Sequence, residues 1–203
     1  PQFKSKQMRC VHDSWHECRL RRAAARGNAA VVTSLLHGCA TAEVMRRADH
    51  FAMCAVAAAR GDFVDVLIAL SAAGVDLERA APGPLGATPA IAAASAGCGT
   101  ALEVLAGLGV NVSARASDSG VTPAIVAARR GDDQVLAALA RCGANLDVQS
   151  TRGGASPAFV AAFEGHTRCI VVLIRSGANV NAPRRRDGAT PLHVAAQSGF
   201  ADT

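Results

Sequence analysis

A short motif returns at a fixed interval along this chain of 203 residues. Thr88-Pro89, Thr122-Pro123, Ser156-Pro157 and Thr190-Pro191 follow one another at intervals of 34 residues. Each pair is followed, nine residues after its Thr or Ser, by a glycine. A period of about 20–50 residues is typical of repeat arrays, in which each unit packs only against its neighbours. The chain is therefore expected to fold as a row of similar units.

The unit around Thr122 shows how each repeat begins. Thr122 is a good N-cap because its side-chain oxygen can accept a hydrogen bond from a backbone N–H of the first helical turn. Pro123 suits the first helical position, where its missing N–H costs nothing. A short helix of small residues then reaches Arg130, and Gly131 supplies the backbone freedom that ends it. The sequence predicts one short helix at this place in each unit.

A second helix follows in the same unit. Asp132 or Asp133 starts it, Gly143 ends it, and its apolar residues recur at helical spacing at Val135, Leu136 and Leu139. One such helix pair cannot bury its apolar face alone, but stacked copies can. We therefore predict stacked pairs of helices, each about 6–10 residues long, with extended turns between units and almost no strand.

Two earlier units are recognisable without the Thr-Pro pair. Gly61 and Gly27 extend the glycine series at gaps of 36 and 34 residues, each after an alanine-rich segment that it is expected to end. We expect a flanking segment at residues 1–17 and an array over residues 18–203. The approximate units are 18–47, 48–82, 83–116, 117–150, 151–184 and a truncated unit at 185–203.

The last two units carry a family resemblance. The segment Asp187-Gly-Ala-Thr-Pro-Leu-His-Val-Ala-Ala-Gln-Ser-Gly199, and the unit from Ser156 to Ala182, resemble the ankyrin repeat. The resemblance covers roughly residues 18–203 and implies an all-α solenoid of stacked helix–turn–helix units joined by extended turns. It further implies a protein–protein interaction module, a scaffold or adaptor with no catalytic, cofactor or metal site. His193 keeps the family's histidine, for which the resemblance implies a structural hydrogen bond.

The resemblance also implies where a partner binds. In ankyrin arrays the turn tips and the exposed ends of the first helices line one concave face. Arginine precedes the terminating glycine in three units, and Arg184 to Arg186 form a triplet at a later turn. Stacking of the units is therefore expected to align these arginines in a discontinuous basic stripe. An acidic partner segment could be held there by guanidinium forks, although charged residues at such places also simply solvate helix ends. The candidate residues are Arg26, Arg60, Asp118, Ser119, Arg129, Arg130, Arg152, Phe163, Glu164, Arg186 and Asp187.

Charge and composition leave two alternatives open. The net charge is +5, but residues 1–60 alone carry +6, so the basic character belongs to one end. Arginines suit a nucleic-acid or lipid phosphate surface, whereas 3% aromatic residues offer little base stacking, so nucleic acid is a disfavoured partner. The second alternative is the recognition arm of a larger multidomain enzyme or of a ubiquitin-ligase adaptor.

The remaining signals concern compartment and chain length. Seven scattered cysteines, an odd number, favour buried thiols in a reducing cytoplasm or nucleus. Cys10, His12, His16 and Cys18 have a spacing that suits no common zinc finger, so no metal site is expected. No apolar run is long enough to span a membrane. Because the last unit stops at Thr203 after its first helix, we expect this sequence to be part of a longer chain.

Overall fold

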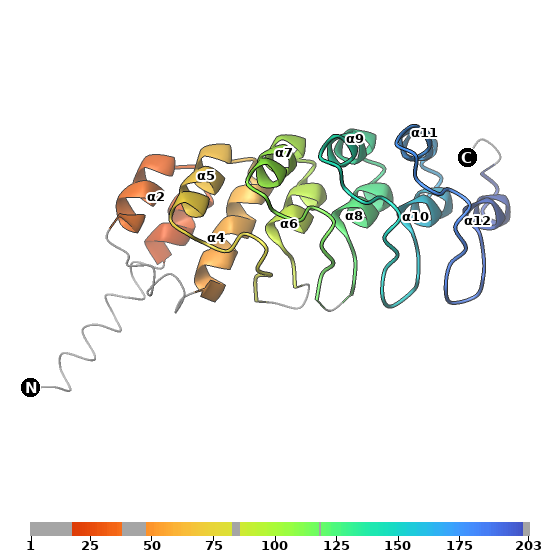
Figure 1. Cartoon of the computed structure of the whole chain (residues 1–203), viewed down its shortest axis with the longest axis horizontal. Coiled ribbons are helices and arrows are strands. Elements are labelled where there is room, and N and C mark those ends of the chain that lie inside the picture. Colours follow the sequence, from red (N-terminus) through yellow and green to blue (C-terminus); the bar gives the residue numbers. More distant parts are fainter. Residues whose placement is uncertain (1–17, 38–47, 83–85, 118, 201–203) are drawn as a thin grey trace, which may run out of the picture.

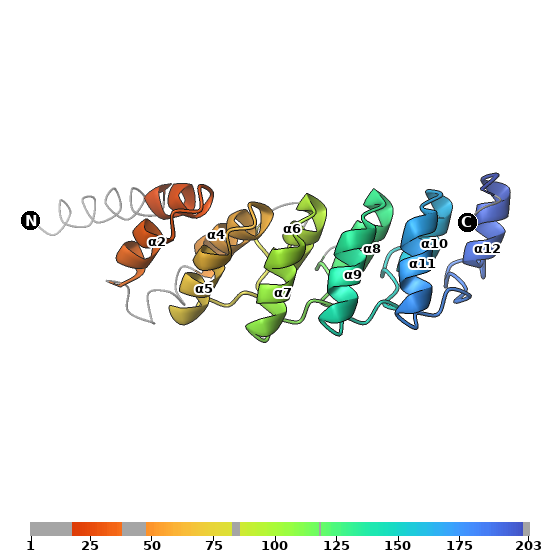
Figure 2. The ribbon, with the colours of Figure 1, turned by 90° about the horizontal axis from the view of Figure 1, so that it is seen from above.

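The chain forms a single row of helix pairs stacked in sequence order (Figures 1 and 2). The computed structural model describes residues 18–37, 48–82, 86–117 and 119–200, and these ranges contain no strand. The predicted all-α repeat solenoid is therefore confirmed. The helices are residues 18–24, α2 (Ala29–Leu36), α4 (Ala48–Arg60), α5 (Val64–Ala72), α6 (Pro89–Ala96), α7 (Gly99–Gly107), α8 (Pro123–Arg130), α9 (Asp133–Arg141), α10 (Pro157–Phe163), α11 (Thr167–Arg175) and α12 (Pro191–Gln197).

The helices form two layers. The first helices α4, α6, α8, α10 and α12 each contact the next first helix, and the second helices α2, α5, α7, α9 and α11 do the same in their own layer. Figure 1 shows the two layers as an upper and a lower row. None of the helices in the described ranges is both long and apolar enough to cross a membrane.

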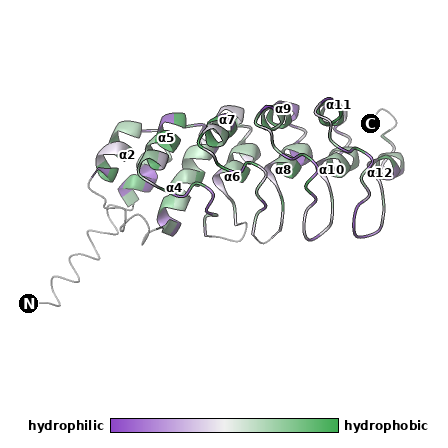
Figure 3. Cartoon of the chain, in the orientation of Figure 1, coloured by the Kyte–Doolittle hydropathy of each residue, from purple (hydrophilic) through white to green (hydrophobic). Residues whose placement is uncertain are grey.

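The layers pack through small residues on one side and leucines on the other. Ala93, Ala127 and Ala161 are completely buried between neighbouring first helices, which can approach closely because alanine is short. Leu102 and Leu136 are also completely buried and fill the space between the layers. Each buried leucine stabilises the fold by about 1.5–3 kcal/mol relative to an exposed one. The apolar helical signal thus becomes a continuous core along the row (Figure 3).

The predicted N-caps are present at every Thr-Pro or Ser-Pro pair. Thr122 has an extended backbone, and its hydroxyl oxygen accepts a hydrogen bond from the Ile125 N–H at 3.3 Å. Thr88, Ser156 and Thr190 cap α6, α10 and α12 in the same way. At Thr190 the hydroxyl also lies 2.7 Å from Nδ1 of His193, so the ring of His193 contacts the cap of its own helix.

The second unit differs from the expected pattern. Helix α4 has 13 residues, more than the predicted 6–10, because no proline stops it from extending back to Ala48. The helix ends at Arg60, directly before Gly61 as predicted, but Gly61 does not take the left-handed conformation of the other terminating glycines. Asp62, with φ of +56°, takes the left-handed position that glycine occupies elsewhere, and its carboxylate accepts a hydrogen bond from the Ala101 N–H at 2.8 Å. That bond to the first turn of α7 compensates for the strained backbone.

The left-handed glycine in each of four units lies beneath a side chain of the next unit. A Cβ atom added at Gly131, where φ is +72°, would be 2.8 Å from Cε1 of His166. The ring of His166 in turn places Nε2 3.3 Å from the Arg129 carbonyl oxygen. Only glycine allows both the backbone conformation and this close contact. The four pairs are Gly27 with Phe63, Gly97 with Asp132, Gly131 with His166 and Gly165 with Phe200.

A hydrogen-bond ladder joins the segments that follow the second helices. The backbone N–H of Asn111 donates to Glu78, that of Asn145 donates to Ser113, and that of Asn179 donates to Asp147, at 2.7–2.8 Å. The acceptor is a side chain of the preceding unit each time. The ladder therefore links consecutive units through backbone donors alone.

Tight turns then project from the array beside the first helices. We name fingers the described residues of four segments, each closed by a backbone hydrogen bond between its first and last residues at 2.8–3.0 Å: 81–82 with 86–87, 116–117 with 119–121, 150–155, and 184–189. Neighbouring fingers touch, since a Cβ atom at Gly120 would be 2.6 Å from the Thr151 nitrogen and one at Gly154 would be 2.8 Å from the Arg185 nitrogen. In Figure 3 the ribbon of the last two fingers is coloured largely as hydrophilic.

Candidate functional site

The first helices and the fingers form one side of the array, which we name the inner face (Figure 1). One hollow opens on this face near the N-terminal end of the described residues, and another opens along the fingers nearer the C-terminal end.

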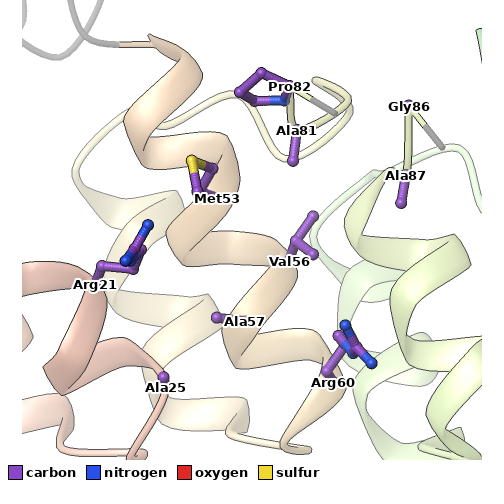
Figure 4. Close-up of a pocket in the computed structure, with 10 residues that line it drawn as sticks. All are labelled: Arg21, Ala25, Met53, Val56, Ala57, Arg60, Ala81, Pro82, Gly86 and Ala87. Carbon is purple, nitrogen blue, oxygen red and sulfur yellow. The ribbon is translucent and has the colours of Figure 1, made fainter. Parts of the chain in front are cut away.

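The first hollow, the helix hollow, lies between the helix of residues 18–24, α4 and the first finger (Figure 4). Its volume is about 450 Å³. It is lined by Arg21, Ala25, Met53, Val56, Ala57, Arg60, Ala81, Pro82, Gly86 and Ala87.

Helical spacing explains why α4 presents these side chains together. Met53, Val56, Ala57 and Arg60 fall on one face of the helix, because residues three, four and seven positions apart lie above one another. The opposite face of α4 is the buried one, which includes Ala55. The floor of the hollow is therefore apolar, and its residues Met53, Val56 and Ala57 are half-buried.

Two arginines give this apolar floor a positive rim. Arg21 and Arg60 enter it from two different helices, and within the described ranges neither guanidinium is paired with a carboxylate. Nearby acidic groups have other partners: Asp49 pairs with Arg79 at 2.7 Å, and Asp62 accepts from the Ala101 N–H. The helix hollow can accept an apolar side chain with a negative group beside it.

The second hollow, the finger hollow, lies among the last three fingers. Its volume is about 390 Å³, and it collects Arg115, which directly precedes one finger, and arginines from the next two fingers. Gln149 at this place donates from Nε2 to the Pro183 carbonyl oxygen at 3.0 Å. The lining residues are Arg115, Gln149, Ser150, Thr151, Arg152, Gly153, Gly154, Arg185 and Arg186.

The predicted stripe residues at the helix ends do not share one register. All four arginines concerned, Arg26, Arg60, Arg129 and Arg130, are exposed. Counted from the left-handed residue, Arg26 and Arg130 lie one position before it, whereas Arg60 and Arg129 lie two positions before it. For Arg60 the cause is Asp62, which shifts the left-handed position of the second unit by one residue, whereas Arg129 simply precedes Arg130. The arginines thus belong to two neighbouring rows.

The predicted finger residues divide between the finger hollow and structural roles. Arg152 and Arg186 come together in the hollow, although 34 residues separate them. Asp187 binds Arg184 and the Ala189 N–H, and the Arg184 hydrogen bond lowers the pKa of its carboxyl group to about 2. Ser119 is half-buried and its hydroxyl accepts from the Val121 N–H at 3.4 Å.

Three further predictions concern single positions. Phe163, 53% exposed, ends α10, and Glu164 follows it as the exposed C-cap. Neither lines one of the two hollows. Asp118 lies outside the described residues, as do Cys10, His12 and His16 of the sequence cluster.

Sequence reasoning missed most of the residues that line the hollows. Met53 and Val56 were absent from the candidates, although their helical spacing with Arg60 was a usable signal. Arg115 and Arg185 were also absent, because only the stacking of fingers places them beside Arg152.

Three of the described thiols, those of Cys98, Cys142 and Cys169, lie where burial keeps them protonated. Burial raises the pKa of the Cys98 and Cys142 thiols, and it raises that of Cys169 to about 11. These groups are therefore protonated at neutral pH, whereas a nucleophilic cysteine needs a lowered pKa. Cys98 Sγ lies 3.5 Å from the Arg60 carbonyl oxygen, which it approaches as a donor between units.

Comparison with known proteins agrees with this geometry. A family model described as ankyrin repeats in three copies matches residues 52–150 and again residues 124–203. No curated protein matches the chain. Ankyrin repeats are generally protein–protein interaction modules. Because the two matches cover most of the sequence and the described helices repeat as the matched units do, this chain belongs to the ankyrin-repeat family.

Proposed function

We propose that the inner face binds a segment of a partner protein and that the helix hollow is its anchor point. The partner places an apolar side chain on the floor formed by Met53, Val56 and Ala57. An aspartate or glutamate beside it meets the guanidinium groups of Arg21 and Arg60. The observation that carries this proposal is the pairing of an apolar floor with two arginines that have no carboxylate partner in the described structure.

The energetics favour an anchor of this kind. Binding energy in protein interfaces concentrates in a few side chains that fill apolar pockets, surrounded by a polar rim. An arginine that forms a charged hydrogen bond with a partner carboxylate adds on the order of 1–3 kcal/mol. Chemistry at the inner face is not required for this role, which is that of a scaffold or adaptor.

The basic rows extend the proposed contact surface. We place Arg129 and Arg130, at the end of α8, along the path of the same partner segment. Replacement of both by alanine should weaken partner binding by about 1–3 kcal/mol. The free energy of unfolding should change by no more than about 0.5 kcal/mol, because both side chains are exposed.

Selection from a random peptide library displayed on phage tests the anchor. Peptides selected on the intact chain should be enriched in an apolar residue next to aspartate or glutamate. The Arg60→Glu variant should select lysine or arginine at the acidic position. Ala57→Trp fills the hollow, and its selected peptides should lose the apolar–acidic pattern.

Matched controls separate this outcome from a general effect. Arg168→Glu makes the same charge change on α11, and Ala30→Trp adds the same ring on α2, both at exposed positions of the second-helix layer. Neither control should alter the selected pattern, while circular dichroism shows that all variants remain folded. The proposal fails if the intact chain enriches no such pattern, or if Ala57→Trp and Arg60→Glu select the same peptides as the intact chain.

A further inference from the structure

We propose that the finger hollow is a receptor for the phosphate group of a phosphorylated side chain carried by the partner protein. The inference rests on the proposed function, because the phosphate reaches the fingers as part of a partner segment. The hollow lies several units away along the chain from the helix hollow and has a different chemistry. It would make recognition of the partner depend on a covalent modification of that partner.

The first support is the collection of positive charge. Arg115, Arg152, Arg185 and Arg186 line one hollow, and among its described lining residues none is acidic. Within the described ranges, none of these four guanidinium groups has a carboxylate partner. Like charges held close together repel one another, and a bound anion relieves that repulsion.

The triplet Arg184 to Arg186 also supports a phosphate site, because its three arginines have different roles. Arg184 forms an ion pair with Asp187, and its guanidinium carbon lies 4.5 Å from the centroid of the Phe159 ring. Arg184 is thereby occupied and fixes the base of its finger. Arg185 and Arg186 instead line the hollow. Asp187, the acidic group beside them, is held by Arg184, although Arg186 also lowers its pKa.

The backbone fixes the positions from which the arginines extend. Gly120 lies close against Thr151, and Gly154 lies close against Arg185, so neighbouring fingers are packed directly on one another. The side chain of Gln149 ties one finger to the next through its hydrogen bond to Pro183. A site assembled in advance loses less free energy on binding than one that must be ordered by its ligand.

The charge and shape of the hollow favour phosphate over a carboxylate. A phosphorylated serine, threonine or tyrosine carries about −1.5 to −2 charges at pH 7 and three acceptor oxygens. Guanidinium forks match phosphate oxygens in pairs, so several arginines can bind one group at once. Ser150 and Thr151 belong to the same lining, and their side chains carry hydroxyl groups that are able to donate hydrogen bonds.

The surroundings favour a single phosphate on a polypeptide. A nucleic-acid strand presents a phosphate at every nucleotide and usually gains affinity by stacking its bases on aromatic rings. No aromatic residue is among the described lining residues of the finger hollow. A lipid surface would be met by apolar side chains, whereas the exposed residues Arg152, Arg186 and Asp187 of the last two fingers are charged.

Fluorescence anisotropy with labelled peptide libraries tests the inference on the full 203-residue chain. Three libraries carry a central phosphoserine, phosphothreonine or phosphotyrosine, and three matched libraries lack the phosphate. At least one phosphorylated library should bind ten times more tightly than its unphosphorylated counterpart. The Arg115→Ala/Arg152→Ala variant should remove that difference, and Arg152→Lys should remove part of it because lysine keeps the charge but not the fork.

The control variant is Arg168→Ala/Arg175→Ala, which removes two exposed charges from α11. It should bind the phosphorylated library as the intact chain does. Equal binding of phosphorylated and unphosphorylated libraries would overturn the inference, and so would an equal loss in the control variant. Single-stranded RNA and phosphatidylserine vesicles are also tested as competitors of the labelled phosphopeptides. The inference is overturned if either one competes better than unlabelled phosphopeptide does and if that competition depends on Arg115 and Arg152.

The test distinguishes this inference from the proposed function. Peptides chosen by phage display through the helix hollow carry no phosphate. If they bind while phosphorylation has no effect, only the finger site is wrong. If phosphopeptides bind while Ala57→Trp leaves peptide selection unchanged, only the anchor is wrong.

Discussion

Replacement of a left-handed glycine by alanine separates the cost of backbone strain from the cost of a contact between units. Gly131 and Gly143 have almost the same φ, +72° and +71°. A Cβ atom at Gly143 would have no atom within 4 Å, whereas one at Gly131 would lie 2.8 Å from Cε1 and Nδ1 of His166. The two positions therefore share the strain but not the contact.

The magnitudes follow from these distances. Alanine in the left-handed region costs about 1–2 kcal/mol, which is the full expected effect of Gly143→Ala. At Gly131 the ring of His166 must also retreat by about 0.6 Å or more to reach an ordinary contact distance. That movement lengthens its hydrogen bond to the Arg129 carbonyl oxygen, which is 3.3 Å long, and the loss of such a bond costs about 0.5–1.5 kcal/mol. Gly131→Ala should therefore lower the free energy of unfolding by about 2–3 kcal/mol.

Urea unfolding followed by circular dichroism at 222 nm measures both variants. In a His166→Ala background the ring is absent, so Gly131→Ala should then cost no more than Gly143→Ala. The coupling energy between Gly131→Ala and His166→Ala should be about 1 kcal/mol. The reasoning is refuted if both glycine variants are equally unstable in the intact background, or if the extra cost at Gly131 persists without the ring.

Three further outcomes are expected. Thr122→Ala should lower the free energy of unfolding, measured in urea, by about 1–2 kcal/mol, because the hydroxyl of this 1% exposed residue caps α8. Thr122→Ser should recover most of that loss. A serine variant as unstable as the alanine variant would contradict the role of the hydroxyl as the cap. NMR titration should place the pKa of Asp187 near 2 and show it rising in Arg184→Ala. Because this pKa is lowered on folding, the ion pair between Arg184 and Asp187 stabilises the fold above about pH 4, and this stabilisation is lost as the pH falls toward 2. An unchanged pKa of Asp187 in the Arg184→Ala variant would exclude Arg184 as the cause. Cys169, buried and with a pKa of about 11, should react with a thiol reagent at pH 8 far more slowly than exposed Cys18 until the chain unfolds, and equal rates would contradict its burial.

Local chemistry made much of the fold predictable. Thr122 and Pro123 define a helix start by themselves, since the cap bond and the proline act within four residues. Where that signal was missing, the prediction was less accurate. The length of α4 depended on a proline that is not there, and Asp62 took a conformation that glycine usually takes because a neighbouring unit offers it a hydrogen bond.

The candidate site was less predictable because it depends on stacking. Arg152 and Arg186 were identified as free turn positions, but the sequence could not show that Arg115 lies beside them, since their proximity follows from contacts between fingers. At the other end, Arg60 was identified without the apolar floor next to it. The hollow above that floor needs both α4 and the first finger, which are brought together only in the folded chain.

The hydrogen-bond ladder between the segments that follow the second helices has a consequence for how such a chain changes in evolution. Its donors are backbone N–H groups, and its acceptors are as different as Glu78, Ser113 and Asp147. Any side chain with an oxygen at the right distance serves, so the joint between two units does not depend on which two units meet. Loss or duplication of one whole 34-residue period in a gene would bring together a donor and an acceptor that already fit. Array length can therefore drift in whole units while each surviving joint stays intact, and the two hollows can move closer or farther apart in steps of one repeat.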